Sequence, residues 1–192
     1  AIKVAINGFG RIGRCTLRAI WEQGLQDEFD VVAINASGDL KTNSHLLKYD
    51  TTHGRFTTPV ETDGENCIIV GGKRIAFYST KNPKDINWAE HGVDVLLECT
   101  GAYTSKAKAQ ALLEQGAKRV LISAPGGDDV DATIVFGVND NLLTQAMTVV
   151  SNASCTTNCL APVAKVLSDN IGIKQGLMTT IHAYTNDQVL VD

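Results

Sequence analysis

A short apolar strand followed at once by three spaced glycines is the feature that most limits how this chain can fold. Residues Ile2 to Ile6 are mostly apolar, as expected for a strand buried on both faces of a parallel sheet. The pattern Gly8-x-Gly10-x-x-Gly13 follows, and it leads into a helical stretch from Ile12 to Gln23. This order predicts a dinucleotide-binding unit in a Rossmann-type, doubly wound, mostly parallel α/β sheet.

Each glycine has its own physical task in such a turn. Gly8 allows the tight turn, Gly10 lets the backbone approach a pyrophosphate, and Gly13 lets the helix pack close to the strand. The backbone amides of Arg11 and Ile12, at the start of the helix, are expected to bind the phosphates. A glycine-rich turn without a ligand is the alternative.

Later segments continue the α/β pattern. The strand from Asp30 to Asn35 should meet the adenosine ribose at Asn35, Ala36 and Ser37. Segments Cys67–Val70 and Arg74–Tyr78 flank a Gly71-Gly72 turn and predict a hairpin added antiparallel to the sheet. The remaining predicted elements are a buried strand at Val93–Cys99, a helix at Lys106–Gln115 with Ala107, Ala111 and Leu112 inward and Gly116 after its end, and short strands at Arg119–Ser123 and Thr133–Phe136.

A run of small polar residues and thiols, from Ser151 to Cys159, lies between a β-branched strand and an apolar helix pattern. It is therefore a strand-to-helix turn, and a helix that begins there directs its free N–H groups and dipole at Cys155. These groups stabilise a thiolate, which makes Cys155 the candidate nucleophile. The apolar positions of the following helix are Leu160, Val163, Ala164, Val166 and Leu167.

Two other interpretations of Cys155 remain open. It could be a small buried residue, or it could bind a metal with Cys159, although no second pair of ligands is visible. Cys159 itself is expected to be buried one helical turn further on. A strand is predicted from Gly176 to His182, and His182 at its end could serve as the base that a thiol nucleophile needs.

Composition narrows the class of protein. The chain has 192 residues, a net charge of −4 and no long run of Lys or Arg, which disfavours a nucleic-acid partner. No apolar run approaches the ~20 residues of a membrane helix, and the first residues already form a strand. Five cysteines without a framework spacing fit reduced thiols. We therefore expect a cytoplasmic protein without a membrane partner or a metal.

The nonapeptide Ser151–Cys159, continued by Leu160-Ala161-Pro162, resembles the active-site signature of the phosphorylating glyceraldehyde-3-phosphate dehydrogenase family. The resemblance extends along nearly the whole chain but covers only the N-terminal part of a family member. Besides the nonapeptide, it is carried by Ile6–Arg14, Leu46–Asp50, Cys99–Gly101, Ile122–Pro125 and Thr179–Gln188.

The resemblance implies a division of the chain and a reaction. Residues 1–153 would form the dinucleotide-binding domain, and residues 154–192 would begin an α+β catalytic domain whose remainder lies beyond Asp192. The reaction would be oxidative phosphorylation of glyceraldehyde 3-phosphate with inorganic phosphate, by a homotetramer of glycolysis or the Calvin cycle. A sister enzyme acting on erythrose 4-phosphate and a dinucleotide-binding fragment without activity are the alternatives.

Site residues follow from the same resemblance. Cys155 would be the nucleophile and His182 the base. Ser154 and Thr156 would hold the attacking phosphate, and Thr185 the phosphate of the substrate, with Gln188 nearby. Thr100, Gly101 and Ser123 would lie along the cofactor, and Lys81 stands where many members carry an arginine near the adenine.

The cofactor is expected to be NADP, or either dinucleotide, rather than strictly NAD. An acidic residue at the end of the second strand binds the ribose of NAD and repels a 2′-phosphate, but Ala36 follows Asn35 here. Ser37, the Gly38 backbone and Lys41 could bind a phosphate. Asp39 is the competing candidate that could still bind the ribose of NAD.

Overall fold

A computed structural model of the chain describes residues 1–184. Strands and helices alternate over most of this length. In chain order the elements are β1 (Ile2–Asn7), α1 (Arg11–Glu22), β2 (Phe29–Asn35), α2 (Leu40–Lys48), β3 (Tyr49–Asp50), β4 (Gly54–Arg55), β5 (Val60–Asp63), β6 (Cys67–Val70), β7 (Lys73–Tyr78), η1 (Pro83–Asp85), η2 (Trp88–His91), β8 (Val95–Glu98), α3 (Lys106–Glu114), β9 (Arg119–Ile122), β10 (Ala132–Thr133), η3 (Asp140–Leu142), β11 (Val149–Ser151) and α4 (Cys155–Asn170).

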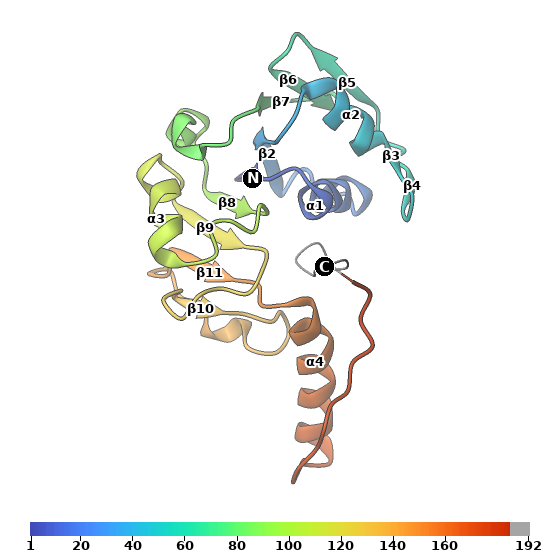
Figure 1. The fold of residues 1–192 in the computed structure, drawn as a ribbon, viewed down its shortest axis with the longest axis vertical. Helices are drawn as coiled ribbons and strands as arrows, with labels where there is room; N and C mark the ends of the chain where they lie inside the picture. Colours follow the sequence, from blue (N-terminus) through green and yellow to red (C-terminus); the bar gives the residue numbers. More distant parts are fainter. Residues whose placement is uncertain (185–192) are drawn as a thin grey trace, which may run out of the picture.

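Within these residues nine strands form one sheet in the order β10-β11-β9-β8-β1-β2-β7-β6-β5 (Figure 1). The pairs from β10 to β7 are parallel, whereas β6 and β5 are added antiparallel. The expected doubly wound, mostly parallel α/β fold is therefore confirmed. The β6–β7 hairpin also forms as expected, although β7 itself pairs parallel with β2.

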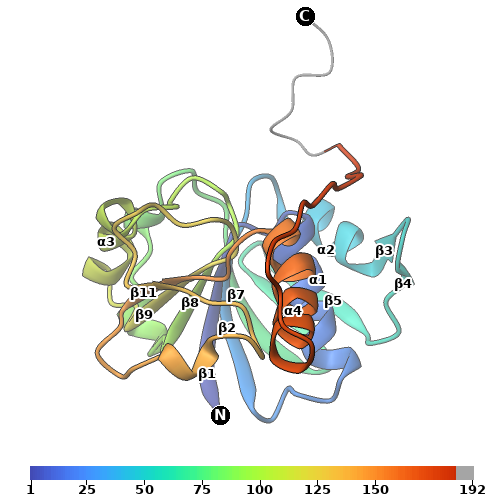
Figure 2. The same ribbon diagram turned by 90° about the horizontal axis from the view of Figure 1, so that it is seen from below.

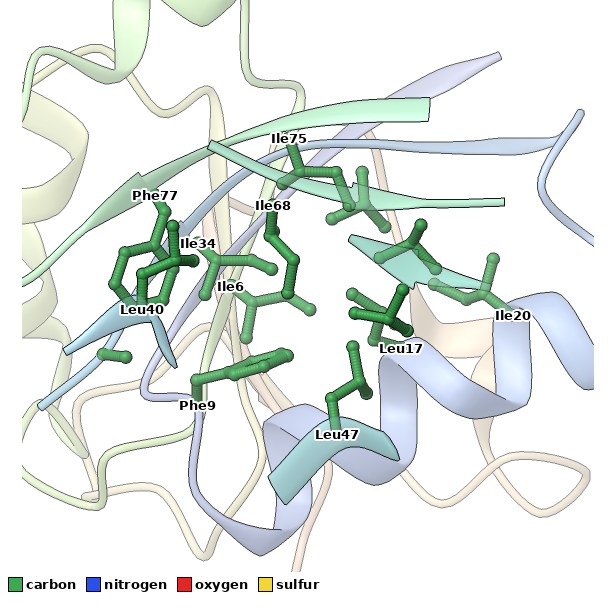
Figure 3. Packing of buried hydrophobic residues seen from close by; sticks show 14 of the residues in the cluster. Ile6, Phe9, Leu17, Ile20, Ile34, Leu40, Leu47, Ile68, Ile75 and Phe77 are labelled. Atoms are coloured by element: carbon green, nitrogen blue, oxygen red, sulfur yellow. The ribbon is translucent and has the colours of Figure 1, made fainter. Parts of the chain in front are cut away.

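Both faces of the sheet are covered by helices. Neighbouring residues of a strand point to opposite faces, so they belong to different core clusters. Ile6 belongs to a core cluster that includes Leu17 of α1 and Leu47 of α2 (Figure 3). Ala5, the preceding residue of β1, belongs to a second cluster that includes Leu112 of α3. This double coverage explains the nearly continuous apolar sequence of the inner strands.

Helix α4 and the chain after it lie apart from these clusters. The helix projects from the sheet, and the following segment runs back beside it (Figures 1 and 2). None of the sixteen residues of α4 is buried. Pro162 lies inside this helix, which begins at Cys155.

Four local predictions were wrong. Residues 176–182 form no strand, since a strand needs a hydrogen-bonded neighbour and no described residue pairs with this segment. Cys159 is exposed because nothing in the described chain buries its helix. In α3 Leu112 is buried as expected, but the second buried residue is Ala109, so the inward face is rotated away from Ala107, which is exposed. Of the predicted strand at Thr133–Phe136, only Thr133 belongs to a strand, the two-residue β10.

Close packing of α1 on β1 depends on Gly13, and this gives a first prediction. A Cβ atom at Gly13 would lie 2.2 Å from the carbonyl oxygen of Gly8. At an open helical position, replacing glycine by alanine would raise the free energy of unfolding by as much as about 1 kcal/mol. We expect Gly13→Ala instead to lower the free energy of unfolding by about 1–3 kcal/mol through overpacking.

Denaturant unfolding measures this change, and Gly10→Ala is the matched control. A Cβ atom at Gly10 meets no atom within 4 Å. The control should change the free energy of unfolding by about 1 kcal/mol or less, the usual range for an N-cap position. A stable Gly13→Ala variant would show that the helix does not depend on this contact.

Candidate active site

The residues expected to bind a ligand lie after the parallel strands, at one edge of the sheet. The glycine turn follows β1, and Asn35, Ala36 and Ser37 end or follow β2. Because the carboxyl ends of parallel strands share one edge, these segments meet above the end of β1, on whose two sides the strands β2 and β8 are added. At such a switch point an open α/β sheet has its ligand crevice. The other expected residues follow β7, β8, β9 and β11, and they are Lys81, Thr100, Gly101, Ser123, Ser154, Cys155 and Thr156.

The turn between β1 and α1 fits a pyrophosphate. Gly8 has φ +98°, and a Cβ atom there would lie 2.7 Å from the backbone of Cys99 and Thr100. Gly10 faces open space and is the N-cap of α1, with no side-chain hydrogen bond to the cap. The first N–H groups of α1, including those of Arg11 and Ile12, therefore meet an uncluttered space that suits an anion.

The side chain of Arg11 is held to one side of this turn. Its guanidinium donates to both carboxylate oxygens of Asp50, at 2.7 and 3.3 Å. Asp50 also accepts from the backbone N–H groups of Thr52 and His53. The hydrogen bond from Arg11 is the main reason that the pKa of Asp50 lies well below its usual range. Sequence reasoning did not find Asp50, because no local pattern pairs it with Arg11.

The second strand ends in two buried residues and one exposed residue. Asn35 was expected to meet the ribose, but its side chain bonds inward to Asn7 and Thr80 and does not reach the crevice. Ala36 is 3% exposed, whereas Ser37 is exposed. Asp39 caps α2 by accepting from the backbone N–H and the hydroxyl of Thr42, at 2.6 and 3.1 Å. A ribose hydroxyl that donates to Asp39 would compete with this cap.

At the other end of the edge, the start of α4 presents Cys155. Ser154 is the N-cap, and its hydroxyl accepts from the N–H of Thr157 at 3.0 Å. Ala153 has φ +59°, a left-handed conformation that is costly for a residue with a Cβ atom. This strained turn directs Cys155, the first residue of the helix, outward from the end of β11.

The thiol of Cys155 contacts His182. The distance from Sγ to Nε2 is 3.1 Å, although the two residues are 27 positions apart. His182 Nδ1 also bonds to the carbonyl oxygen of Ala183, and because a carbonyl oxygen can only accept, Nδ1 carries a proton. The hydrogen bond with His182 is the largest cause that lowers the pKa of Cys155. The pair is exposed, so solvent reaches the sulfur.

Neither the thiol of Cys99 nor a metal site competes with this pair in the part of the chain that the structure describes. Burial raises the pKa of Cys99 to about 11, so its thiol is a poor nucleophile. Within residues 1–184, no group of three or more His, Cys, Asp or Glu side chains could hold a metal ion. Thr185 and Gln188, two expected substrate contacts, lie outside the described residues.

Two buried polar residues beneath the crevice were also missed. Glu98 and Asn7 end β8 and β1, and their side chains bond to each other at 2.6 Å. The available signal was an acidic residue within the apolar strand Val93–Cys99, since an acid is rarely buried without partners. Its partner could not be identified without the register between the strands.

A doubly wound sheet with an open glycine turn at its switch point and a cysteine–histidine pair at the same edge defines a dinucleotide-binding protein with an activated thiol. Comparison with known proteins names the family. Residues 2–106 match the NAD binding domain of glyceraldehyde 3-phosphate dehydrogenase, and residues 154–192 match its C-terminal domain. The chain therefore belongs to the glyceraldehyde-3-phosphate dehydrogenase family, and its sheet is the nicotinamide-dinucleotide-binding domain.

Curated relatives agree along the whole chain. A plasmid-encoded glyceraldehyde-3-phosphate dehydrogenase of Cupriavidus necator is 58% identical over 191 residues, which is 100% of this chain and 56% of the relative. The Pseudomonas aeruginosa enzyme is 56% identical over 191 residues, again 100% of this chain, and 57% of the relative. Glyceraldehyde-3-phosphate dehydrogenase 2 of Bacillus subtilis is 50% identical over 192 residues, with 100% and 55% covered. The chain thus spans about half the length of these relatives.

In the part of the chain that the structure describes, no helix is long and apolar enough to cross a membrane.

The contact between Cys155 and His182 generates a second prediction. Because His182 lowers the pKa of Cys155, the thiolate is present below the ordinary pH range of a free thiol and is lost only as pH falls further. We expect the rate of Cys155 alkylation by iodoacetamide to rise at a lower pH than that of Cys99, whose pKa is about 11.

Replacing His182 tests the cause of this difference. His182→Asn should move the midpoint of the pH–rate profile of Cys155 upward and leave the profile of Cys99 unchanged. Peptide mass spectrometry after timed alkylation measures both thiols in one sample. A profile of Cys155 that does not move would assign the lowered pKa to the helix terminus alone.

Proposed function

We propose that the protein catalyses NAD(P)-dependent oxidative phosphorylation of glyceraldehyde 3-phosphate to 1,3-bisphosphoglycerate. The observation that carries the proposal is the 3.1 Å contact between Cys155 Sγ and His182 Nε2, at the carboxyl edge of a nicotinamide-dinucleotide-binding domain. The curated relatives are named for this activity, which leaves the erythrose 4-phosphate alternative without comparable support.

Cys155 and His182 have complementary tasks in this reaction. The Cys155 thiolate adds to the aldehyde carbon, and the resulting oxyanion takes a proton from the His182 imidazolium to give a hemithioacetal. His182 takes the proton of the hemithioacetal hydroxyl as the carbon is oxidised to a thioester. A bound nicotinamide ring supplies the acceptor for the hydride that this oxidation releases. An oxygen of inorganic phosphate then attacks the thioester carbon, which releases the acyl phosphate and returns the thiolate of Cys155.

The start of α4 supports the anionic stages of this sequence. N–H groups of the first turn can stabilise the oxyanion that develops beside Cys155. Thr156 is half-buried next to the thiol, and we assign it to the attacking phosphate together with Ser154. Ser154 has a second task, because its hydroxyl caps the helix. Thr185 is assigned to the phosphate of the substrate.

The domain division and assembly belong to the same proposal. We assign residues 1–153 to the dinucleotide-binding domain and residues 154–192 to the beginning of the catalytic domain. The sheet ends with β11 at Ser151, and the match to the C-terminal domain begins at residue 154, which supports this boundary. A homotetramer is proposed from family membership.

Cys155→Ser gives a third prediction. Turnover, followed as formation of reduced nicotinamide from glyceraldehyde 3-phosphate and phosphate, should fall by at least on the order of 10³-fold, since the covalent step is lost. Cys159→Ser is the matched control, because Cys159 is also exposed on α4 one turn away. Its turnover should stay close to that of the parent. Comparable losses in both variants would contradict the assignment of the nucleophile.

We further propose that the dinucleotide site accepts NADP. Ala36 replaces the acidic residue that would repel a 2′-phosphate. The carboxylate of Asp39 already accepts two hydrogen bonds as the cap of α2. Ser37 is exposed on the loop after β2 and can contribute a hydroxyl, and Lys41 is exposed in the first turn of α2 and can contribute a positive charge. These features support use of NADP beside NAD, without excluding NAD.

The fourth prediction uses Ser37, because a carboxylate at the buried Ala36 would also disturb packing. Ser37→Asp should lower kcat/KM for NADP relative to NAD by about tenfold or more, since one like-charge contact costs roughly 1–4 kcal/mol. Ser168→Asp, at an exposed position on α4, is the control for charge alone. An unchanged ratio for Ser37→Asp would place the ribose elsewhere.

A further inference from the structure

Three polar side chains are buried side by side beneath the cofactor crevice. The sheet register aligns Asn35 of β2 with Asn7 of β1, and Asn7 with Glu98 of β8. Asn35, Asn7 and Glu98 are 4%, 1% and 0% exposed, respectively. Polar groups in such a position cost stability unless each finds a hydrogen-bond partner. The three side chains satisfy one another in a single row.

The direction of the hydrogen bonds along this row is set by the main chain. The N–H of Thr80 donates to Asn35 Oδ1 at 3.1 Å, and the carbonyl oxygen of Thr80 accepts from Asn35 Nδ2 at 3.2 Å. A backbone N–H can only donate and a backbone carbonyl oxygen can only accept, so Asn35 cannot flip. Asn35 Nδ2 must then donate to Asn7 Oδ1, at 2.8 Å. Asn7 Nδ2 in turn donates to Glu98 Oε2, at 2.6 Å.

On its other side Glu98 also acts only as an acceptor. Glu98 Oε1 accepts from the N–H of Thr100 at 2.7 Å and bonds to the Thr100 hydroxyl. That hydroxyl accepts from the N–H of Ala102 at 3.0 Å, so its own proton is available for Glu98. Burial raises the pKa of Glu98, whereas its bonds to Thr100 and Asn7 oppose this rise. The ionised carboxylate fits all of these contacts.

This row ends at the wall of the crevice. Thr100 touches the glycine turn, because a Cβ atom at Gly8 would lie 2.7 Å from the N atom of Thr100. Gly8 N–H also donates to the carbonyl oxygen of Asn35, and Cys99 N–H donates to that of Asn7. The carboxylate of Glu98 therefore fixes the segment that faces the pyrophosphate turn. Within residues 1–184 no salt bridge involves Glu98, so hydrogen bonds alone hold it.

We propose that Glu98 is a positioning residue for the nicotinamide dinucleotide: as the common acceptor for Asn7 and Thr100, it sets the turn after β8 against the glycine turn after β1. Glu98 is buried and does not itself touch the cofactor. The inference rests on the proposed dinucleotide site and adds to it a residue that shapes the site from below.

Exchanging one acceptor for a donor tests the proposal. In Glu98→Gln the new amide can face either Thr100 or Asn7 with its NH₂ group, and both of these neighbours are donors. Flipping Asn7 would only move the conflict to Asn35 and the fixed peptide of Thr80. Asn7→Asp instead sets two carboxylates against each other. Each single variant should weaken binding of NAD⁺ and NADP⁺ by on the order of tenfold, the usual effect of one unsatisfied buried group.

The double variant Asn7→Asp/Glu98→Gln restores every donor–acceptor pair and the original charge. The new amide donates to the new carboxylate and accepts from Thr100, while Asn35 still donates to position 7. We expect dissociation constants within about threefold of the parent. Calorimetric titration of the intact protein, at a temperature where thermal scans show each variant folded, measures these constants. Glu114→Gln, at an exposed position of α3, is the matched control and should bind as the parent does.

The alkylation rate of Cys155 separates positioning from general damage, since a defect confined to the crevice leaves this rate unchanged. Parent-like binding by Glu98→Gln would overturn the proposal. So would a double variant that binds no better than Glu98→Gln, or one that fails to fold. If only the single variants fail to fold, parent-like binding by the double variant supports the proposal. A parent that binds neither dinucleotide would contradict the proposed function itself.

Discussion

The position of β1 between β2 and β8 is the constraint on which the rest of the structure depends. From β1 the sheet grows toward β2 on one side and toward β8 on the other. The helices that follow β1 and β8 therefore pack on opposite faces, which is the arrangement that leaves a crevice above the end of β1. Gly8 and Gly13 are small enough for the turn after β1 to touch the turn after β8 and for α1 to pack on the strand. The segments that hold the expected ligand-binding residues, up to Ser123, then lie at one edge because the strands are parallel.

The two halves of the site are built by different physical means. The dinucleotide half is supported from below by two core clusters and by the buried row from Asn35 to Glu98, so its shape is set before any ligand arrives. The thiol half depends on one helix terminus and one histidine, both exposed. Packing therefore shapes the proposed dinucleotide site, whereas hydrogen bonding and the helix dipole act on the thiol of Cys155.

Sequence reasoning succeeded where the signal is local. The glycine turn after β1 and the helix N-terminus at Cys155 each lie within a short segment, and their residue types have direct physical reasons. It failed where the answer depends on distant partners. Asn7 and Glu98 are 91 residues apart, so their contact follows only from the register of β1 and β8. The segment before His182 resembles a strand, but a strand forms only where a neighbouring backbone can pair with it.

The central claim is that Cys155 and the dinucleotide act on one aldehyde within one site. The most direct measurement is rapid mixing of the protein with glyceraldehyde 3-phosphate and excess dinucleotide in the absence of phosphate. Absorbance should report a burst of reduced nicotinamide that approaches one equivalent per chain, and peptide mass spectrometry of the quenched sample should find the acyl group on Cys155. A sample without a burst, or an acyl group on another cysteine, would contradict the account.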